Sequence, residues 1–300
     1  MRELPREGML LAIDGMPVKA GGCAANVAID LVKQGHAVDI VGCLGRDPAA
    51  QTLRSTLTAH GVGCDQLATT DQYPTSRTVV LLVEGQDRRF IHVFGANRAL
   101  TVDHISREWV AGLKVLYIGG LFALPGLDPA ALRDLLIFCR TMGVITVVDV
   151  VMTQSWQSRG ELNALLPHID YFLPNDDEAH LITGLTDPLA QLRFFRHAGA
   201  HTVIITQGKS GAYAGRGGDY WRSGTYPAKV VDPSGSGDAF GAGLIAAIHR
   251  GGDLPDLLRY GSALGASATR AVGTTDGVFT ASEAAAFIAA NNLPITMGKL

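Results

Sequence analysis

Short apolar runs rich in β-branched residues alternate along most of the chain with longer stretches in which apolar residues recur every three or four positions. Runs of the first kind predict buried strands, and stretches of the second kind predict amphipathic helices. The predicted strands are Val38–Gly42, Val115–Ile118, Ile145–Val148, Tyr171–Leu173 and Val203–Thr206, and the helices include Pro48–His60, Pro129–Thr141, Glu178–Thr183 and Pro188–Ala198. This alternation predicts an α/β protein whose largely parallel sheet is covered on both faces, with ligands at the carboxyl ends of its strands.

Two regions depart from the alternation. Met9–Lys19 and the pair Arg77–Glu84 and Arg88–Phe94, joined around Gly85-Gln86-Asp87, predict antiparallel strands with a hairpin turn. We interpret them as a small β lid inserted into the α/β body, and an ordinary edge meander is the alternative. Beyond Gly251 the pattern is helical again, over Leu254–Ala271 and Ala281–Ala290. No repeat or linker divides the chain, so we expect residues 1–300 to form one domain.

Composition narrows the range of partners. The 300 residues are 47% hydrophobic, which is ample for a large buried core. A net charge of −3 with scattered basic residues argues against nucleic acid or an acidic membrane as a partner, so the ligands are expected to be small molecules. The four cysteines form no C-x-x-C pair, no secretion signal precedes them, and no apolar run reaches the roughly 18 residues that span a bilayer. These features predict a cytoplasmic protein.

The stretch with the most chemical information is a glycine-rich turn at 234–237 that leads into an apolar helix, predicted over Ala239–His249. Small residues let backbone N–H groups converge there, and the helix dipole adds positive charge, so the turn predicts an anion cradle. Asp238 follows directly. A carboxylate beside bound phosphate is unfavourable unless it accepts a proton from the attacking group, so we interpret Asp238 as a general base. The alternative is an ordinary first-turn aspartate after a common loop.

Two other phosphate-binding motifs fail on spacing. A dinucleotide-binding fingerprint beginning at Gly235 would need a glycine where Phe240 stands. Gly208-Lys209-Ser210 is typical of the end of a P-loop, but the earlier glycine of that motif would fall at Val203, inside a predicted strand. Neither a dinucleotide site nor a P-loop is therefore expected.

Asp232-Pro233-Ser234-Gly235-Ser236-Gly237-Asp238 closely resembles the Asp-Thr-x-Gly-Ala-Gly-Asp signature of the ribokinase-like, or PfkB, carbohydrate kinases. Further matches follow the family's order, at 21–26, 174–178 and 206–212, and the resemblance covers roughly residues 5 to 285. It implies a three-layer α/β/α sandwich with a β lid that closes over the sugar and often builds a dimer. It also implies transfer of the γ-phosphate of ATP to a sugar or nucleoside hydroxyl.

The resemblance assigns roles to individual positions. Asp238 would be the general base, with the backbone of Gly235, Ser236 and Gly237 as the anion hole. The sugar-binding residues would be Gly21, Gly22 and Asn26, and the nucleotide-binding residues Thr206, Gly208, Gly211 and Gly273. Asn175 and Glu178 would organise Mg²⁺, partly through water, although an Asn with a Glu three residues later is also typical of a helix capping box. Asp232 and Ser234 match positions that hold K⁺ in some members, but Pro233 replaces the usual Thr.

One departure from the family concerns its first strand and a sugar-gripping Asp, which precede the segment matched by Pro5–Gly8. This sequence starts at Met1, so neither feature has a counterpart. A missing central strand would leave backbone groups unpaired and a gap in the core, and our hypothesis is that the natural start lies upstream. The leading functional prediction is a sugar kinase acting on ribose, fructose, ketodeoxygluconate or a similar acceptor. A nucleoside kinase and a sugar- and nucleotide-binding protein without turnover are the alternatives.

Overall fold

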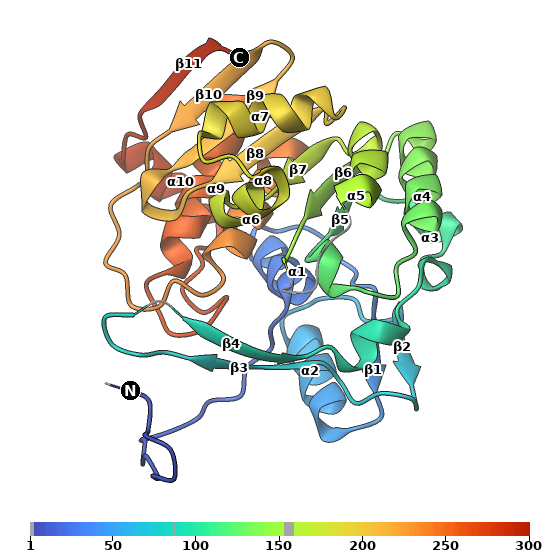
Figure 1. Cartoon of the computed structure of the whole chain (residues 1–300), viewed down its shortest axis with the longest axis vertical. Coiled ribbons are helices and arrows are strands. Elements are labelled where there is room, and N and C mark those ends of the chain that lie inside the picture. The colour runs from blue at the N-terminus through green and yellow to red at the C-terminus, as the bar shows by residue number, and fades with distance from the viewer. Residues whose placement is uncertain (1–2, 87, 153–158) are drawn as a thin grey trace.

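A seven-stranded mixed sheet forms the middle layer of the computed structural model, which describes residues 3–86, 88–152 and 159–300. Its strand order is β11-β10-β9-β8-β7-β6-β5 (Figure 1). The strands are β5 (Val115–Ile118), β6 (Ile145–Asp149), β7 (Tyr171–Leu173), β8 (Thr202–Thr206), β9 (Ala212–Arg216), β10 (Asp219–Ser223) and β11 (Ile295–Lys299). β5 to β8 run parallel as predicted, whereas β9, β10 and β11 pair antiparallel and were not predicted.

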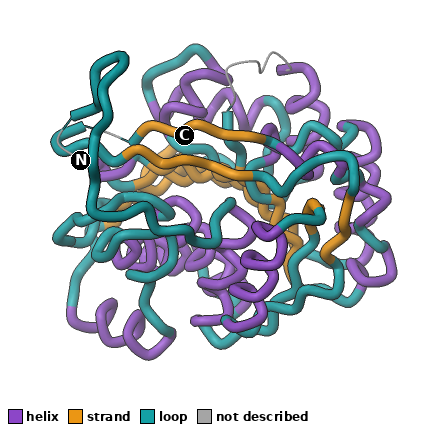
Figure 2. Tube along the Cα trace, turned by 90° about the horizontal axis from the view of Figure 1, so that it is seen from below, coloured by secondary structure: helices purple, strands orange, loops and turns teal. Residues whose placement is uncertain are grey.

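Helices cover both faces of this sheet, which confirms the predicted three-layer α/β/α arrangement (Figure 2). The helices are α1 (Cys23–Lys33), α2 (Pro48–Ala59), α3 (Arg107–Ala111), α4 (Pro129–Met142), α5 (Arg159–Leu165), α6 (Asp176–Thr183), α7 (Pro188–His197), α8 (Ser236–His249), α9 (Leu254–Ala268) and α10 (Ala281–Ala290). Apolar side chains of α4 to α7 pack on one face of the sheet, and those of α1, α8 and α9 pack on the other. Alternate residues of each parallel strand therefore point into two separate cores.

Side-chain caps fix where several of these helices begin. Asp47, Asp128, Asp187 and Asp253 each accept the backbone N–H three residues later, and a proline follows in the first turn. Proline is favourable there because its missing N–H would have no partner within the helix. Within the described ranges, no helix is both long enough and apolar enough to cross a bilayer.

The predicted lid is correct in its hairpin and wrong in its first segment. β3 (Arg77–Leu81) and β4 (Arg89–Val93) pair antiparallel, with bounds a few residues shorter than predicted, and Asp87 of the turn lies outside the described residues. Residues 9–19 form no strand. Pro17 lacks the N–H that a ladder needs, and Leu10 and Val18 are 90% and 85% exposed, so the segment has neither a partner strand nor a buried face.

A gap separates the large sheet from a small parallel sheet made of β1 (Gly42–Gly45) and β2 (Leu67–Thr70). The strand predicted over Val38–Gly42 overlaps β1 only at Gly42, because β1 begins there and continues to Gly45. β5 is the last strand of the large sheet in the described chain, and both β5 and β1 line the same cleft, together with α1. This cleft also holds most of the predicted site residues.

Candidate active site

Gly235 shapes the turn that presents Asp238. Its φ of 77° is left-handed, and a Cβ at this position would overlap the carbonyl oxygen of Thr274. Only glycine fits such a position without moving the neighbouring backbone. α8 then begins at Ser236, three residues earlier than predicted, which places Asp238 in its first turn. The free N–H groups and the positive end of the helix dipole therefore lie beside the Asp238 carboxyl.

Asn26 of α1 holds this carboxyl. Its Nδ2 donates to Asp238 Oδ2 at 2.7 Å, and its Oδ1 accepts from the Thr274 hydroxyl at 2.8 Å. Asn26 is 3% exposed and was predicted to bind sugar hydroxyls. In this structure both the N–H₂ and the carbonyl of the amide hydrogen-bond to protein groups. The contact that the structure shows for Asn26 is therefore with Asp238, which it orients.

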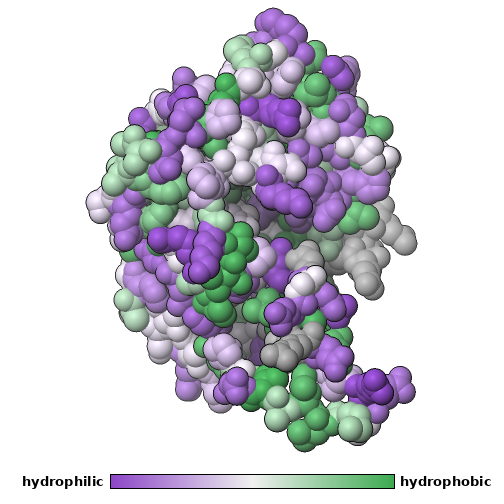
Figure 3. Space-filling model, turned by 90° about the vertical axis from the view of Figure 1, so that its left-hand side faces the viewer, coloured by the Kyte–Doolittle hydropathy of each residue, from purple (hydrophilic) through white to green (hydrophobic). Residues whose placement is uncertain are grey.

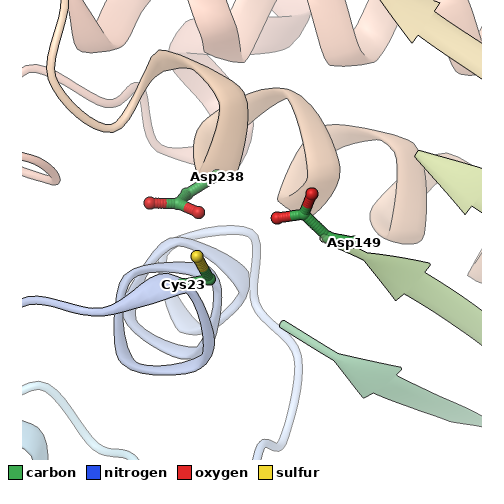
Figure 4. Close-up of side chains that lie close together, drawn as sticks. All are labelled: Cys23, Asp149 and Asp238. Atoms are coloured by element: carbon green, nitrogen blue, oxygen red, sulfur yellow. The ribbon is translucent and has the colours of Figure 1, made fainter. Parts of the chain in front are cut away.

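Cys23 and Asp149 complete the surroundings of Asp238, and the sequence analysis assigned a function to neither. One ligand atom from each of Cys23, Asp149 and Asp238 lies within 4.8 Å of the others. Figure 4 shows the three side chains converging from the starts of α1 and α8 and from the end of β6. The Asp149 carboxyl also accepts the Tyr117 hydroxyl at 3.1 Å. Asp149 directly follows a predicted strand, so the rule that ligands gather at strand ends could have indicated it.

Three neighbouring carboxyls, those of Asp238, Asp149 and Glu178, have raised pKa values. Burial raises the pKa of Asp238, opposed by hydrogen bonds from Asn26 and Cys23. Burial, then Glu178 and Asp238, raise the pKa of Asp149 well above its usual value. Burial also raises the pKa of Glu178 to about 7. Among the described residues, no lysine or arginine is one of the main groups that shift the pKa of these carboxyls. The pocket therefore favours an added cation.

The predicted magnesium pair forms a helix cap. Asn175 Oδ1 accepts the Glu178 N–H at 2.8 Å, and Glu178 Oε2 accepts the Asn175 N–H at 2.9 Å. The capping alternative is therefore present. It also places Glu178 in the same cleft as Asp238, close enough to Asp149 to raise the pKa of that carboxyl. Clustered carboxylate oxygens without a basic partner are a donor set that fits Mg²⁺.

Asp232 and Ser234 lie under the glycine-rich turn. Asp232 accepts the N–H groups of Ser234 at 2.9 Å and of Gly273 at 3.1 Å, which ties the turn to the loop that follows α9. The Ser234 hydroxyl is buried and has no hydrogen-bond partner in the described chain. A buried, unpaired polar atom is uncommon, and its position here fits an oxygen ligand of a monovalent cation.

The cleft brings most of the predicted site residues together. Those that line it are Gly21, Gly22, Asn26, Asn175, Glu178, Asp232, Ser234, Gly235, Asp238 and Gly273. Ser236 and Gly237 lie at the start of α8, between two lining residues, and are not part of the lining themselves. Thr206, Gly208 and Gly211 lie at the end of β8 and in the turn to β9, outside the lining of this cleft. Gly211 has a local reason to be glycine, because a Cβ there would overlap the Ser223 carbonyl oxygen.

Comparison with known proteins identifies the family. A sequence model described as pfkB family carbohydrate kinase matches residues 3–281. The chain belongs to the pfkB family of carbohydrate kinases. Similar proteins include the 5-dehydro-2-deoxygluconokinase of Photobacterium profundum, 27% identical, covering 89% of this chain and 86% of the relative. The ribokinase of Haemophilus influenzae is 23% identical, with coverages of 94% and 92%.

Solved structures support the fold of this pfkB kinase. Arabidopsis thaliana ribokinase complexed with ribose and ATP aligns with a TM-score of 0.82 and 23% identity, covering 96% of this chain and 93% of that one. A putative ribokinase II from E. coli in complex with ATP and Mg²⁺ aligns with a TM-score of 0.78 and 22% identity, covering 95% of each chain. The ribokinase-like fold predicted from the sequence is thus confirmed.

Proposed function

We propose that this carbohydrate kinase moves the γ-phosphate of ATP to a sugar hydroxyl, with Asp238 as the general base and the 235–238 backbone as the anion hole. One observation carries the proposal. The Asp238 carboxyl faces the cleft at the N-terminal end of α8, held by Asn26 and adjoining the turn at Gly235.

The chemistry follows from that placement. Phosphoryl transfer spreads negative charge over the equatorial oxygens, and backbone N–H groups at a helix N-terminus stabilise such charge. Asp238 accepts the proton of the acceptor hydroxyl as its oxygen attacks phosphorus. The raised pKa of Asp238 makes it a better proton acceptor than an exposed aspartate. Asn26 donates to Oδ2 of Asp238, and Cys23 donates to the same carboxyl, so both groups orient the base toward the acceptor hydroxyl.

Magnesium is part of the proposal. Glu178 and Asp149 would hold the ion, in part through water, and Asn175 fixes Glu178 through the helix cap. Bound Mg²⁺ would neutralise charge on the phosphates. The unpaired Ser234 hydroxyl supports a potassium site with Asp232. Comparing turnover in K⁺ and Na⁺ tests this site, and equal rates in the two salts would remove it.

The proposed sugar side comprises Gly21 and Gly22, directly before α1, which line the cleft together with residues of the β3–β4 hairpin. Thr206, Gly208, Gly211 and Gly273 remain the proposed nucleotide side. The hairpin also supports a homodimer through the lid, because apolar side chains on it are exposed: Val79, Phe90, Ile91 and Val93. Figure 3 shows hydrophobic side chains exposed on the side of the molecule that it draws, some of them low in the view. A monomer at micromolar concentration in sedimentation would exclude this dimer.

An ADP-release screen tests the function. Ribose, fructose, 2-dehydro-3-deoxygluconate, 5-dehydro-2-deoxygluconate and a panel of nucleosides would each be offered with ATP and Mg²⁺. We expect one sugar to give turnover that Asp238→Asn loses. Turnover with nucleosides alone would select the nucleoside kinase alternative. Sugar binding in calorimetry without ADP release from any acceptor would select the binding protein.

A further inference from the structure

We propose that Thr274 is a positioning residue for Asp238 and acts through Asn26. The inference rests on the proposed function, because it explains how the general base is held. Thr274 belongs to the loop after α9, whereas Asn26 lies in α1 and Asp238 in α8. The three side chains form a continuous chain of hydrogen bonds, from the Thr274 hydroxyl to Asn26 Oδ1 and from Asn26 Nδ2 to Asp238 Oδ2.

The chemistry of the amide makes Thr274 necessary. A carboxylate only accepts hydrogen bonds, so Asn26 must turn its N–H₂ toward Asp238 and its carbonyl away. That carbonyl is buried, and the Thr274 hydroxyl is the donor it receives in the described structure. Without that hydroxyl the carbonyl would be left unsatisfied, and the amide would rotate to find another donor. Rotation would withdraw Nδ2 from Asp238.

Thr274 is itself fixed by contacts on both sides. Its backbone packs directly against Gly235, where there is no room for a Cβ. The N–H of Gly273 donates to Asp232, and the Lys33 ammonium donates to the Thr275 carbonyl. The loop is therefore anchored to the anion-hole turn and to α1 at once. Thr274 thus links the position of the anion hole to the orientation of the base.

The surroundings of Asp238 make the hydrogen bond from Asn26 electrostatically important. The titratable groups that face Asp238 are acids on every element packed against it: Cys23 and Asp30 of α1, Tyr117 of β5, Asp149 of β6 and Glu178 of α6. Each of them, when charged, would oppose the charged form of Asp238, whereas the neutral Cys23 thiol donates a hydrogen bond that favours it. Donation from Asn26 favours that form. A loosened Asn26 would therefore raise the pKa of Asp238.

Three variants test the proposal on the acceptor that wild type uses best. Thr274→Val removes the hydroxyl and keeps the side-chain volume, and Thr274→Ser keeps the hydroxyl. Thr275→Val is the matched control, since the Thr275 hydroxyl makes no hydrogen bond among the described residues. We expect Thr274→Val to lower kcat about tenfold, as for loss of one orienting hydrogen bond, with the KM for ATP changed by less than about twofold. Its acid limb in the kcat profile should move to higher pH.

Rescue and structure complete the test. Thr274→Ser should restore both kcat and the pH profile, and Thr275→Val should match wild type. A Thr274→Val enzyme with the kcat and pH profile of Thr275→Val would overturn the proposal, as would failure of serine to rescue. If wild type releases no ADP with any acceptor, the proposed function fails instead. A crystal structure of Thr274→Val then tests the positioning role without any turnover. An Asn26 amide that still donates to Asp238 in that structure would show that Thr274 does not position Asn26.

Discussion

Asp30 gives the sharpest prediction about stability. It lies on α1, is 0% exposed, and neither of its carboxylate oxygens has a hydrogen-bond partner in the described chain. Burial raises its pKa from 3.8 to about 8, and the nearby Lys33 lowers it only in part. The folded protein thus keeps Asp30 protonated at pH 7, whereas the unfolded chain ionises it. We predict that Asp30→Asn, which is neutral in both states, stabilises the protein at neutral pH.

The magnitude follows from proton linkage. Between pH 3.8 and about 8 the folded state binds one proton more at Asp30 than the unfolded state does, so this group lowers stability as pH rises. The slope is about 1.4 kcal/mol per pH unit. At pH 7 the accumulated cost is at most about 4 kcal/mol, because pH 7 lies 3.2 units above the ordinary aspartate pKa of 3.8. Near pH 4 the cost is close to zero.

Urea unfolding of wild type and Asp30→Asn from pH 4 to pH 8 measures this cost. The free energies of unfolding should be similar at pH 4 and should diverge steadily above it, with the variant more stable. Asp65→Asn, at an exposed aspartate, is the control for a general effect of charge and should show no such divergence. A difference between Asp30→Asn and wild type that does not change with pH would refute the reasoning, as would a variant that is less stable throughout.

Two further predictions concern the site. Gly235→Ala should lower turnover on the order of a hundredfold, because its Cβ would push the Thr274 backbone away and displace the anion hole. ADP release measures this loss. The Tm of Gly235→Ala is compared with the Tm of Gly237→Ala, whose added methyl group would meet no atom within 4 Å, as the control for folding. Glu178→Gln should raise the Mg²⁺ concentration needed for half-maximal rate about tenfold, since it removes one of the clustered charges that favour the ion. An unchanged Mg²⁺ titration would exclude Glu178 from the metal site.

Periodicity predicted the centre of the fold better than its edges. β5 to β8 were found because strands buried on both faces leave continuous apolar runs. β9 to β11 pair antiparallel at the sheet edge, where Gly215 and Gly298 interrupt any apolar run. Residues 9–19 were wrongly predicted as a strand for the opposite reason. Their apolar side chains suggested a strand, but pairing depends on a partner that local sequence does not reveal.

The part of the candidate site that lies in one continuous segment of sequence could be predicted. The turn at Gly235 and the first-turn Asp238 are local features, and the structure places both as expected. Cys23 and Asp149 were missed because they meet Asp238 only through tertiary packing of α1, β6 and α8. The contact between Asn26 and Asp238 has the same origin.

Turnover of Asp238→Asn on the best sugar acceptor tests the central claim most directly. The variant keeps the shape of the side chain and its place in the first turn of α8, but it loses the proton acceptor. We predict unchanged folding by circular dichroism and a fall in kcat of about a hundredfold to ten-thousandfold. A correctly folded Asp238→Asn enzyme that phosphorylates the sugar at close to the wild-type rate would contradict the assignment of Asp238 as the general base.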